Sequence, residues 1–153
     1  LMKKGYQAAD ILTQCSRLDK AGIGYYFFYL TGICGAGRGE AGARATAAVC
    51  NQLHPRIVGA NMLTVYSDSL LYEEIQKGNW KEESETEKYR EMRTLVQHLE
   101  IPTVFAALGA SNAFQMWYTL PDDKERLLAF LDDVIRTTNE EELRRYRDSV
   151  HHL

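Results

Sequence analysis

The fold is decided by residues 23–53, which read IGYYFFYLTGICGAGRGEAGARATAAVCNQL. Ile23–Leu30 is an aromatic and aliphatic run that is too short for a stand-alone helix, and it predicts a strand buried on both faces. Gly32–Gly39 holds four glycines, which let the backbone turn sharply and let a bound molecule approach it closely. Ala41–Leu53 predicts a helix. Strand, glycine loop and helix form half of a βαβ unit, whose loop lies where α/β proteins bind ligands.

Two helices and one charged segment carry expectations about burial. The helix over Ala41–Leu53 has a small-residue face that suits close packing on a sheet. This face comprises Ala41, Ala45, Ala48, Val49 and Leu53. Another helix is predicted over Tyr6–Ala21, and its apolar stripe, which includes Cys15, is expected to face the core. The charged run Lys81–Glu91 is expected to form a solvated helix face.

The remainder of the chain repeats the strand and helix pattern. Strands are predicted over Ile57–Val65 and Thr103–Leu108, and an irregular stretch is expected from there to Leu120. Further helices are predicted over Leu70–Lys77, from the Ser84–Glu87 capping box to Pro102, after Pro121, and from Asn139 onward. This order predicts a single α/β domain over residues 1–153, with a parallel sheet and right-handed crossovers.

The composition is that of an ordinary globular protein. Of the 153 residues, 45% are hydrophobic and 25% are charged, and a net charge of −3 gives no basic field that would attract nucleic acid. No apolar run reaches the length of a membrane span, and no signal peptide is visible. Cys15, Cys34 and Cys50 are odd in number and have neither a disulfide-framework nor a metal-ligand spacing. We therefore expect a cytoplasmic protein without membrane, nucleic-acid or metal sites.

The glycine loop supports more than one hypothesis. Gly37, Gly39 and Gly42 form a literal G-x-G-x-x-G, and Asp68 follows the second expected strand as a ribose-binding acid would. A Rossmann-type nucleotide-binding domain is therefore one alternative, and a flexible loop that binds nothing is the simpler one. A non-enzymatic interaction module, whose exposed sheet recruits a partner, is a further alternative.

Two other features bear on function. Cys34 lies within the glycine loop, but neither His54 nor His98 is expected to reach it, so a catalytic thiol is not expected. Trp117 and Tyr118 lie near the third expected loop. We interpret this pair as a lid over the core, with a binding platform as the alternative.

Several segments, taken in order, resemble the radical S-adenosylmethionine enzymes. Gly22-Ile23, Leu30-Thr31-Gly32 and the glycine loop with Glu40 are similar to the region around the fifth strand of their partial (β/α)6 barrel. The next unit is resembled by residues 51–55 and 63–66, and further along by Ser69, Leu71-Tyr72 and Gly78. Ser111-Asn112 and Leu120–Lys124 resemble the final strand and helix of the branch described as iron–sulfur oxidoreductases. The resemblance runs from about Lys4 to about Ile135.

The resemblance implies parallel βα units that form about half of a partial TIM-type (β/α)6 barrel, with extra C-terminal helices. The family's Cys-x3-Cys-x2-Cys, which holds a [4Fe–4S] cluster, is absent, and the chain starts at Leu1. Gly109 stands where the branch often has a histidine, and residues 67–70 replace its proline-glycine-threonine-proline turn. We therefore expect the C-terminal fragment of an enzyme, inactive alone, whose partner is the missing N-terminal half of the barrel.

By this resemblance, the parent cleaves S-adenosylmethionine reductively and abstracts a hydrogen from an unidentified substrate. Its cofactors are S-adenosylmethionine and the cluster, and neither is expected on this chain alone. The resemblance assigns no catalytic residue here. The positions that it places near the cofactor are Gly32, Gly35, Gly37, Glu40, Thr64, Ser111 and Asn112.

Half of a barrel is also expected to self-associate, as a homodimer in the simplest case. Removing the other half uncovers a strand edge, and unpaired edges template pairing with another chain. It also uncovers alternate side chains of the first strand, because successive residues point to opposite faces. The uncovered set is either Tyr25, Phe27 and Tyr29 or Tyr26, Phe28 and Leu30.

Overall fold

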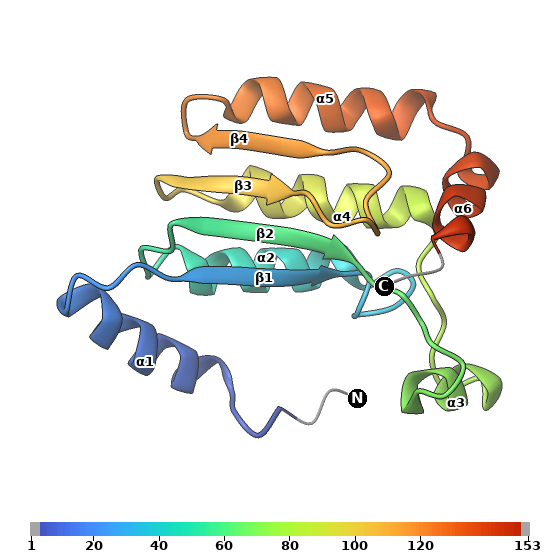
Figure 1. Cartoon of the computed structure of the whole chain (residues 1–153), viewed down its shortest axis with the longest axis horizontal. Coiled ribbons are helices and arrows are strands. Elements are labelled where there is room, and N and C mark those ends of the chain that lie inside the picture. Colours follow the sequence, from blue (N-terminus) through green and yellow to red (C-terminus); the bar gives the residue numbers. More distant parts are fainter. Residues whose placement is uncertain (1–3, 151–153) are drawn as a thin grey trace.

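The structure, a computed structural model, describes residues 4–150. This part of the chain contains a four-stranded sheet and six helices, which confirms the α/β class (Figure 1). The strands are β1 (Tyr26–Thr31), β2 (Ile57–Met62), β3 (Thr103–Ala107) and β4 (Met116–Leu120). The helices are α1 (Ala8–Lys20), α2 (Gly39–Cys50), α3 (Leu70–Gln76), α4 (Glu85–His98), α5 (Lys124–Thr137) and α6 (Glu140–Ser149).

The sheet is mostly parallel. Strands β1, β2 and β3 are parallel neighbours in the order of the sequence, and β4 pairs antiparallel with β3 at the far edge. The register places Phe28 opposite Gly59, Gly59 opposite Ala106, and Ala106 opposite Trp117. Each of the three strands expected from the sequence is present, with ends shifted by a few residues.

Strand β4 corrects the expectation of an irregular stretch up to Leu120. Its residues alternate, with Met116 and Leu120 buried and Trp117 exposed. All five residues of this strand pair with β3, for example Tyr118 with Phe105. A short loop after β3 lets the chain reverse direction, and antiparallel pairing needs no helical crossover. Trp117 and Tyr118 are therefore strand residues: Trp117 is exposed and does not cover the core, whereas Tyr118 packs against it.

Helices α2, α4 and α5 cover one face of the sheet, and in Figure 1 α2 and α4 lie behind the strands. The capping box from Ser84 to Glu87 begins α4, as predicted. The apolar stripe of α4 is almost fully buried and fills the core between this helix layer and the sheet. Its members are Tyr89, Met92, Leu95, Val96 and Leu99.

The other face of the sheet is open in the described part of the chain. Tyr26 and Phe28 of β1 are exposed, whereas Tyr29 and Thr31 point into the core and are buried. The expectation of a strand buried on both faces is therefore wrong. The helix layer covers only one side, so every second residue of β1 lacks cover.

Helix α2 turns a different face to the core than the sequence predicted. Its buried residues are Gly39, Ala43, Ala47 and Cys50. Of the predicted face, Leu53 is buried just beyond the helix, whereas Ala41, Ala45 and Ala48 are exposed. Small residues occur on both sides of this helix, so the hydrophobic pattern did not discriminate between them.

Helix α1 also departs from expectation, because none of its residues is buried. Cys15 is only half-buried and is not a core residue. Figure 1 shows α1 on the far side of β1 from the rest of the sheet, and the apolar residues Ile11, Leu12 and Leu18 of its stripe are only half-buried. No helix within residues 4–150 is long and apolar enough to cross a membrane.

Candidate functional site

The candidate site lies where the parallel strands β1, β2 and β3 end. The loops that follow these strands meet there, and helix α6 lies across the same end of the sheet (Figure 1). Tyr146 of α6 donates hydrogen bonds to the carbonyl oxygens of Ala110 (3.2 Å) and Asn112 (3.3 Å). Arg147 of α6 donates to the carbonyl oxygen of Leu63 at 2.6 Å. The last helix thereby ties together the loops after β2 and β3.

The glycine loop after β1 is held by carboxylates of helix α4. Gly32, Gly35 and Gly37 have φ values of +92°, +79° and +74°, which L side chains rarely adopt. The Gly32 N–H donates to Glu91 at 2.6 Å, and the Gly37 N–H donates to Glu87 at 3.2 Å. Backbone N–H groups in such a loop commonly bind anions. Here the anions are carboxylates of the same chain.

A buried carboxyl pair, Glu83 and Glu91, lies beneath this loop. The two side chains share a hydrogen bond, and the hydroxyl of Tyr29 donates to Glu91. Burial and the neighbouring Glu91 raise the pKa of Glu83 to about 8. A Cβ atom at Gly39 would lie 2.2 Å from Glu83 Oε1 and 2.8 Å from Glu91 Oε2. Only glycine at the start of α2 leaves room for the pair at this helix N-terminus, which favours negative charge.

We expect the stability of the chain to fall as pH rises from 6 to 8.5. An unfolded Glu83 is ionised above about 4.5, whereas the folded protein keeps its proton up to about 8. The folded state thus binds more protons in this window, and its free energy of unfolding decreases by at most about 1.4 kcal/mol per pH unit. Thermal unfolding at several pH values measures this slope. Glu83→Gln should flatten it and Glu87→Gln should not; a wild-type slope in Glu83→Gln would contradict the assignment.

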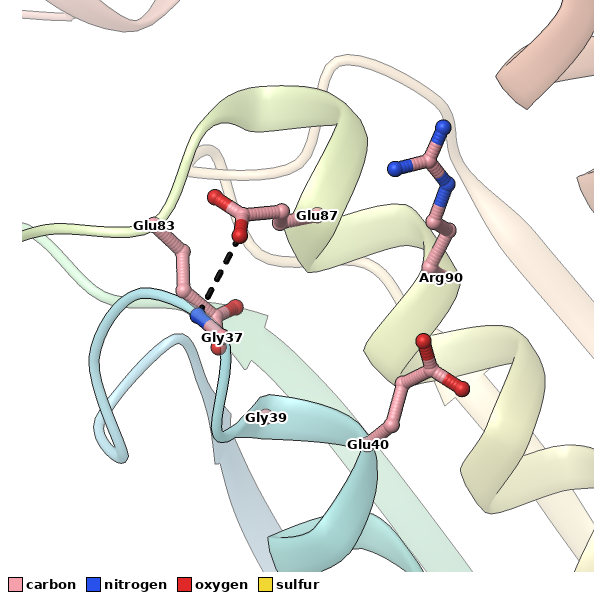
Figure 2. Close-up of a pocket in the computed structure, with 6 residues that line it drawn as sticks. All are labelled: Gly37, Gly39, Glu40, Glu83, Glu87 and Arg90. Atoms are coloured by element: carbon pink, nitrogen blue, oxygen red, sulfur yellow. Dashed lines mark hydrogen bonds between the residues drawn. The ribbon is translucent and has the colours of Figure 1, made fainter.

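A hollow of about 120 Å³ opens beside the glycine loop. Figure 2 shows Glu83 and Glu87 next to Gly37, with Glu40 and Arg90 on the far side. Hydrogen bonds from Ser84 and Gly37 lower the pKa of Glu87, which keeps it ionised. Because Glu83 holds its proton, the charged groups of the lining are the carboxylates of Glu40 and Glu87 and the guanidinium of Arg90, a net negative charge that favours a positively charged group over a phosphate. We call this hollow the acidic hollow.

A second hollow, of about 150 Å³, lies between the loops after β2 and β3 and helix α6. Thr64 and Ser111 line it, and the Ser111 hydroxyl accepts a hydrogen bond from the N–H of Met62 at 3.2 Å. Arg144, Arg147 and Asp148 of α6 also line it, together with Glu82. Neutral hydroxyl groups therefore face two guanidinium groups that already have acidic partners.

These acidic partners belong to a buried ion-pair network that the sequence analysis missed. Lys88 is fully buried and pairs with Glu82 at 2.7 Å and Glu85 at 3.2 Å. Arg147 pairs with the same two carboxylates, each at 2.9 Å. The expectation that Lys81–Glu91 forms a solvated face is therefore wrong for Glu85 and Lys88, which are buried. A buried charge needs a partner of opposite charge, and Arg147 of α6 is such a partner for Glu82 and Glu85.

The sequence contains one signal that predicts the burial of part of this network. The apolar stripe of α4, extended by one turn toward the N-terminus, passes through Glu85 and Lys88. Residues on the core side of a helix are expected to be buried whatever their type. The partners Arg144 and Arg147 lie about 60 residues further along the chain, and no local pattern connects them to α4.

Four of the seven predicted cofactor residues line one of the two hollows, and the other three line neither. Gly37 and Glu40 line the acidic hollow, whereas Thr64 and Ser111 line the one beneath α6. Two predicted glycines contact the chain itself. A Cβ atom at Gly32 would meet the Lys88 side chain at 3.1 Å, and one at Gly35 would meet Trp80 Nε1 at 2.7 Å. Asn112 is fully buried, and its amide donates to the Ala60 carbonyl oxygen at 3.0 Å.

The thiol of Cys34 fits no catalytic role. Burial and the nearby Glu91 and Glu83 raise its pKa, so the reactive thiolate is disfavoured. Gly42, the last residue of the G-x-G-x-x-G, packs against this sulfur, where a Cβ atom would lie only 2.5 Å from Sγ. Within residues 4–150, no group of three or more histidine, cysteine or acidic residues is arranged to hold a metal ion.

Comparisons with protein-family models, with curated proteins and with solved structures find no match to this chain.

Proposed function

We propose that this chain is the C-terminal part of a radical S-adenosylmethionine enzyme of the iron–sulfur oxidoreductase branch, comprising about half of its partial barrel. The observation that carries the proposal is the winding of the sheet. Strands β1, β2 and β3 follow one another in sequence order, and the crossover helices α2 and α4 lie on the same face. Barrels of the TIM type are wound in this way, with all helices outside. A Rossmann domain is wound in both directions and carries helices on both faces.

The ends of the sheet support the same proposal. Strand β1 has one edge without a partner among the described strands, and α1, which precedes it, buries none of its residues. A further βα unit placed beyond β1 would pair with that edge and cover the apolar stripe of α1. In this proposal the missing N-terminal half continues the sheet from β1, and antiparallel β4 ends it on the other side.

The acidic hollow suits one part of the proposed cofactor. S-adenosylmethionine carries an ammonium and a sulfonium group, and the carboxylates of Glu40 and Glu87 suit a cation better than the pyrophosphate of a dinucleotide. The hydroxyl groups of Thr64 and Ser111 are neutral hydrogen-bonding groups of the kind that a purine edge uses. The cluster finds no ligand set within residues 4–150 and would belong to the missing half.

The proposal is tested on the full reading frame that contains this chain. After anaerobic reconstitution, we expect about four irons and four sulfides per full-length protein and reductive cleavage of S-adenosylmethionine. The isolated chain, treated identically, should retain neither iron nor sulfide and should leave S-adenosylmethionine intact. Near-stoichiometric loading of the isolated chain, or a full reading frame without cluster and cleavage, would refute the proposal.

The isolated chain is expected to self-associate through the free edge of β1. A long unpaired edge templates pairing between chains, and a positive charge placed on such an edge suppresses it. Light scattering after size exclusion should show a mass above 17.5 kDa that decreases on dilution into the low micromolar range. Phe28→Lys should shift this equilibrium toward monomer, whereas Leu70→Lys, an exposed apolar position on α3, should not. A wild-type chain that is monomeric at every concentration would contradict the expectation.

A further inference from the structure

The open face of the sheet carries a slot that its strand register builds. Phe28, Gly59, Ala106 and Trp117 are consecutive partners across the four strands, so all four side-chain positions lie in one row on one face. The row runs large, small, small, large. Gly59 and Ala106 form a low floor between two aromatic walls, Phe28 and Trp117, and the Phe28 ring leans over Gly59 to within 3.4 Å of the Cβ position there. Three strand spacings separate the walls, which amounts to about 14 Å between backbones.

The slot is hollow and uncharged. A cavity of about 390 Å³ lies over this row, within the range of about 300–1,000 Å³ typical of small-molecule pockets. Its ten lining residues include no acidic or basic side chain, and the walls remain accessible, with Phe28 80% and Trp117 55% exposed. Such a lining penalises a charged ligand, which would lose its hydration without gaining a partner. Asn61, at the next row, provides a polar group at the rim.

Close packing at the floor keeps it flat. A Cβ atom at Gly59 would contact the Phe28 ring at 3.4 Å, and one at Gly109 would lie 2.2 Å from the side-chain oxygen of Asn61. Side chains at these two positions would fill the space between the walls. Flat ring systems stack favourably on aromatic side chains and lie well on a surface without protruding groups.

We propose that this slot binds a flat, uncharged, fused-ring molecule. The binding site is argued from the register and lining of this chain alone. Its designation as the substrate site rests on the proposed function, because in the proposed barrel this face lines the interior. The substrate class is then a neutral, planar, predominantly apolar ring system rather than a sugar phosphate or an amino acid.

Lumichrome, a neutral tricyclic heteroaromatic compound, is a suitable probe, with 1-adamantanol as a neutral but non-planar counterpart. Binding is measured by calorimetry and by lumichrome anisotropy on the full chain at a concentration where light scattering shows a monomer. We expect a dissociation constant of about 0.1 mM or lower for lumichrome, as for a typical ligand of its size. Adamantanol should bind at least about tenfold more weakly.

Two variants locate the site. Gly59→Val fills the floor with a residue that strands favour, and its Cβ atom makes ordinary contacts, so the variant should fold. Trp117→Ala removes one wall. Each should weaken lumichrome binding about tenfold or more, whereas Tyr72→Ala, which removes an exposed aromatic side chain on α3, should leave it unchanged. Circular dichroism checks that each variant is folded.

Three outcomes would overturn the inference. The first is wild-type affinity for lumichrome in both slot variants. The second is equal affinity for adamantanol and lumichrome. The third is that the monomer binds no lumichrome when lumichrome is present at millimolar concentration. The last would leave a second copy of the chain as the occupant of the face. The assay contains no S-adenosylmethionine or iron, so lumichrome binding together with a failed cluster assay would refute the proposed function and keep the slot.

Discussion

Replacing Glu85 with glutamine is expected to lower the free energy of unfolding by about 3–5 kcal/mol, the usual consequence of removing one partner from a buried ion pair. Glu85 is 1% exposed and contacts Lys88 at 3.2 Å and Arg147 at 2.9 Å. Its amide replacement keeps the shape but leaves the buried cations with Glu82 as their remaining carboxylate. For a domain of this size, the thermal midpoint should fall by roughly 6–20 °C.

The matched control for this substitution is Glu74→Gln on α3. Glu74 also pairs with a lysine, Lys77, at 3.1 Å, but this pair lies at the surface. Exposed ion pairs contribute little to stability, so the midpoint of this variant should remain close to that of the wild type. Equal, small shifts in the two variants would mean that solvent reaches Glu85 and that α6 does not seal the network.

The helices and the three parallel strands are predictable from the sequence because they depend on local patterns. The aromatic run before the glycine loop, the capping box at Ser84 and the stripe from Tyr89 to Leu99 each identify an element without reference to the rest of the chain. Strand β4 is the exception, because the sequence was interpreted as an irregular stretch up to Leu120 although Met116 and Trp117 begin the alternation of a half-buried strand.

The candidate site is less predictable because its contacts are distant in sequence. Glu83 and Glu91 depend on two glycines about 50 residues earlier: Gly39 leaves room for both carboxyl groups, and the N–H of Gly32 donates to Glu91. The glycine pattern is visible in the sequence, but it is equally consistent with a ligand at the loop. Here the nearest neighbours of the loop include carboxylates of the same chain, and composition does not distinguish the two cases.

The sequence also leaves open whether the aromatic side chains of β1 are buried or exposed. A run of aromatic residues predicts burial on both faces when a sheet is covered on both faces. Here the register places Tyr26 and Phe28 on the open side, so burial depends on whether another part of the protein lies there. Sequence patterns report what a strand is suited to pack against and not what is present.

Replacing Gly35 with valine is expected to destabilise the folded chain by about 2–5 kcal/mol. Gly35 has a φ of +79°, which costs an L residue about 1–2 kcal/mol. Its Cβ atom would also lie 2.7 Å from Trp80 Nε1 and 2.9 Å from the Lys81 carbonyl oxygen, and crowding of this kind adds about 1–3 kcal/mol. Gly22→Val separates the two contributions, because Gly22 has a φ of +68° but no heavy atom near the added Cβ position.

Chemical denaturation of the two variants measures both losses, and Gly35→Val should lose clearly more stability than Gly22→Val. This comparison also decides which glycine reports on cofactor approach in the full-length parent. A loss of S-adenosylmethionine binding in Gly35→Val would be confounded by the collision with Trp80 and Lys81. Gly37 has a φ of +74° and open space around the Cβ position, beside the acidic hollow. Gly37→Val should therefore keep most of the stability and still weaken S-adenosylmethionine binding in the parent, and unchanged affinity by calorimetry would place the cofactor away from this loop.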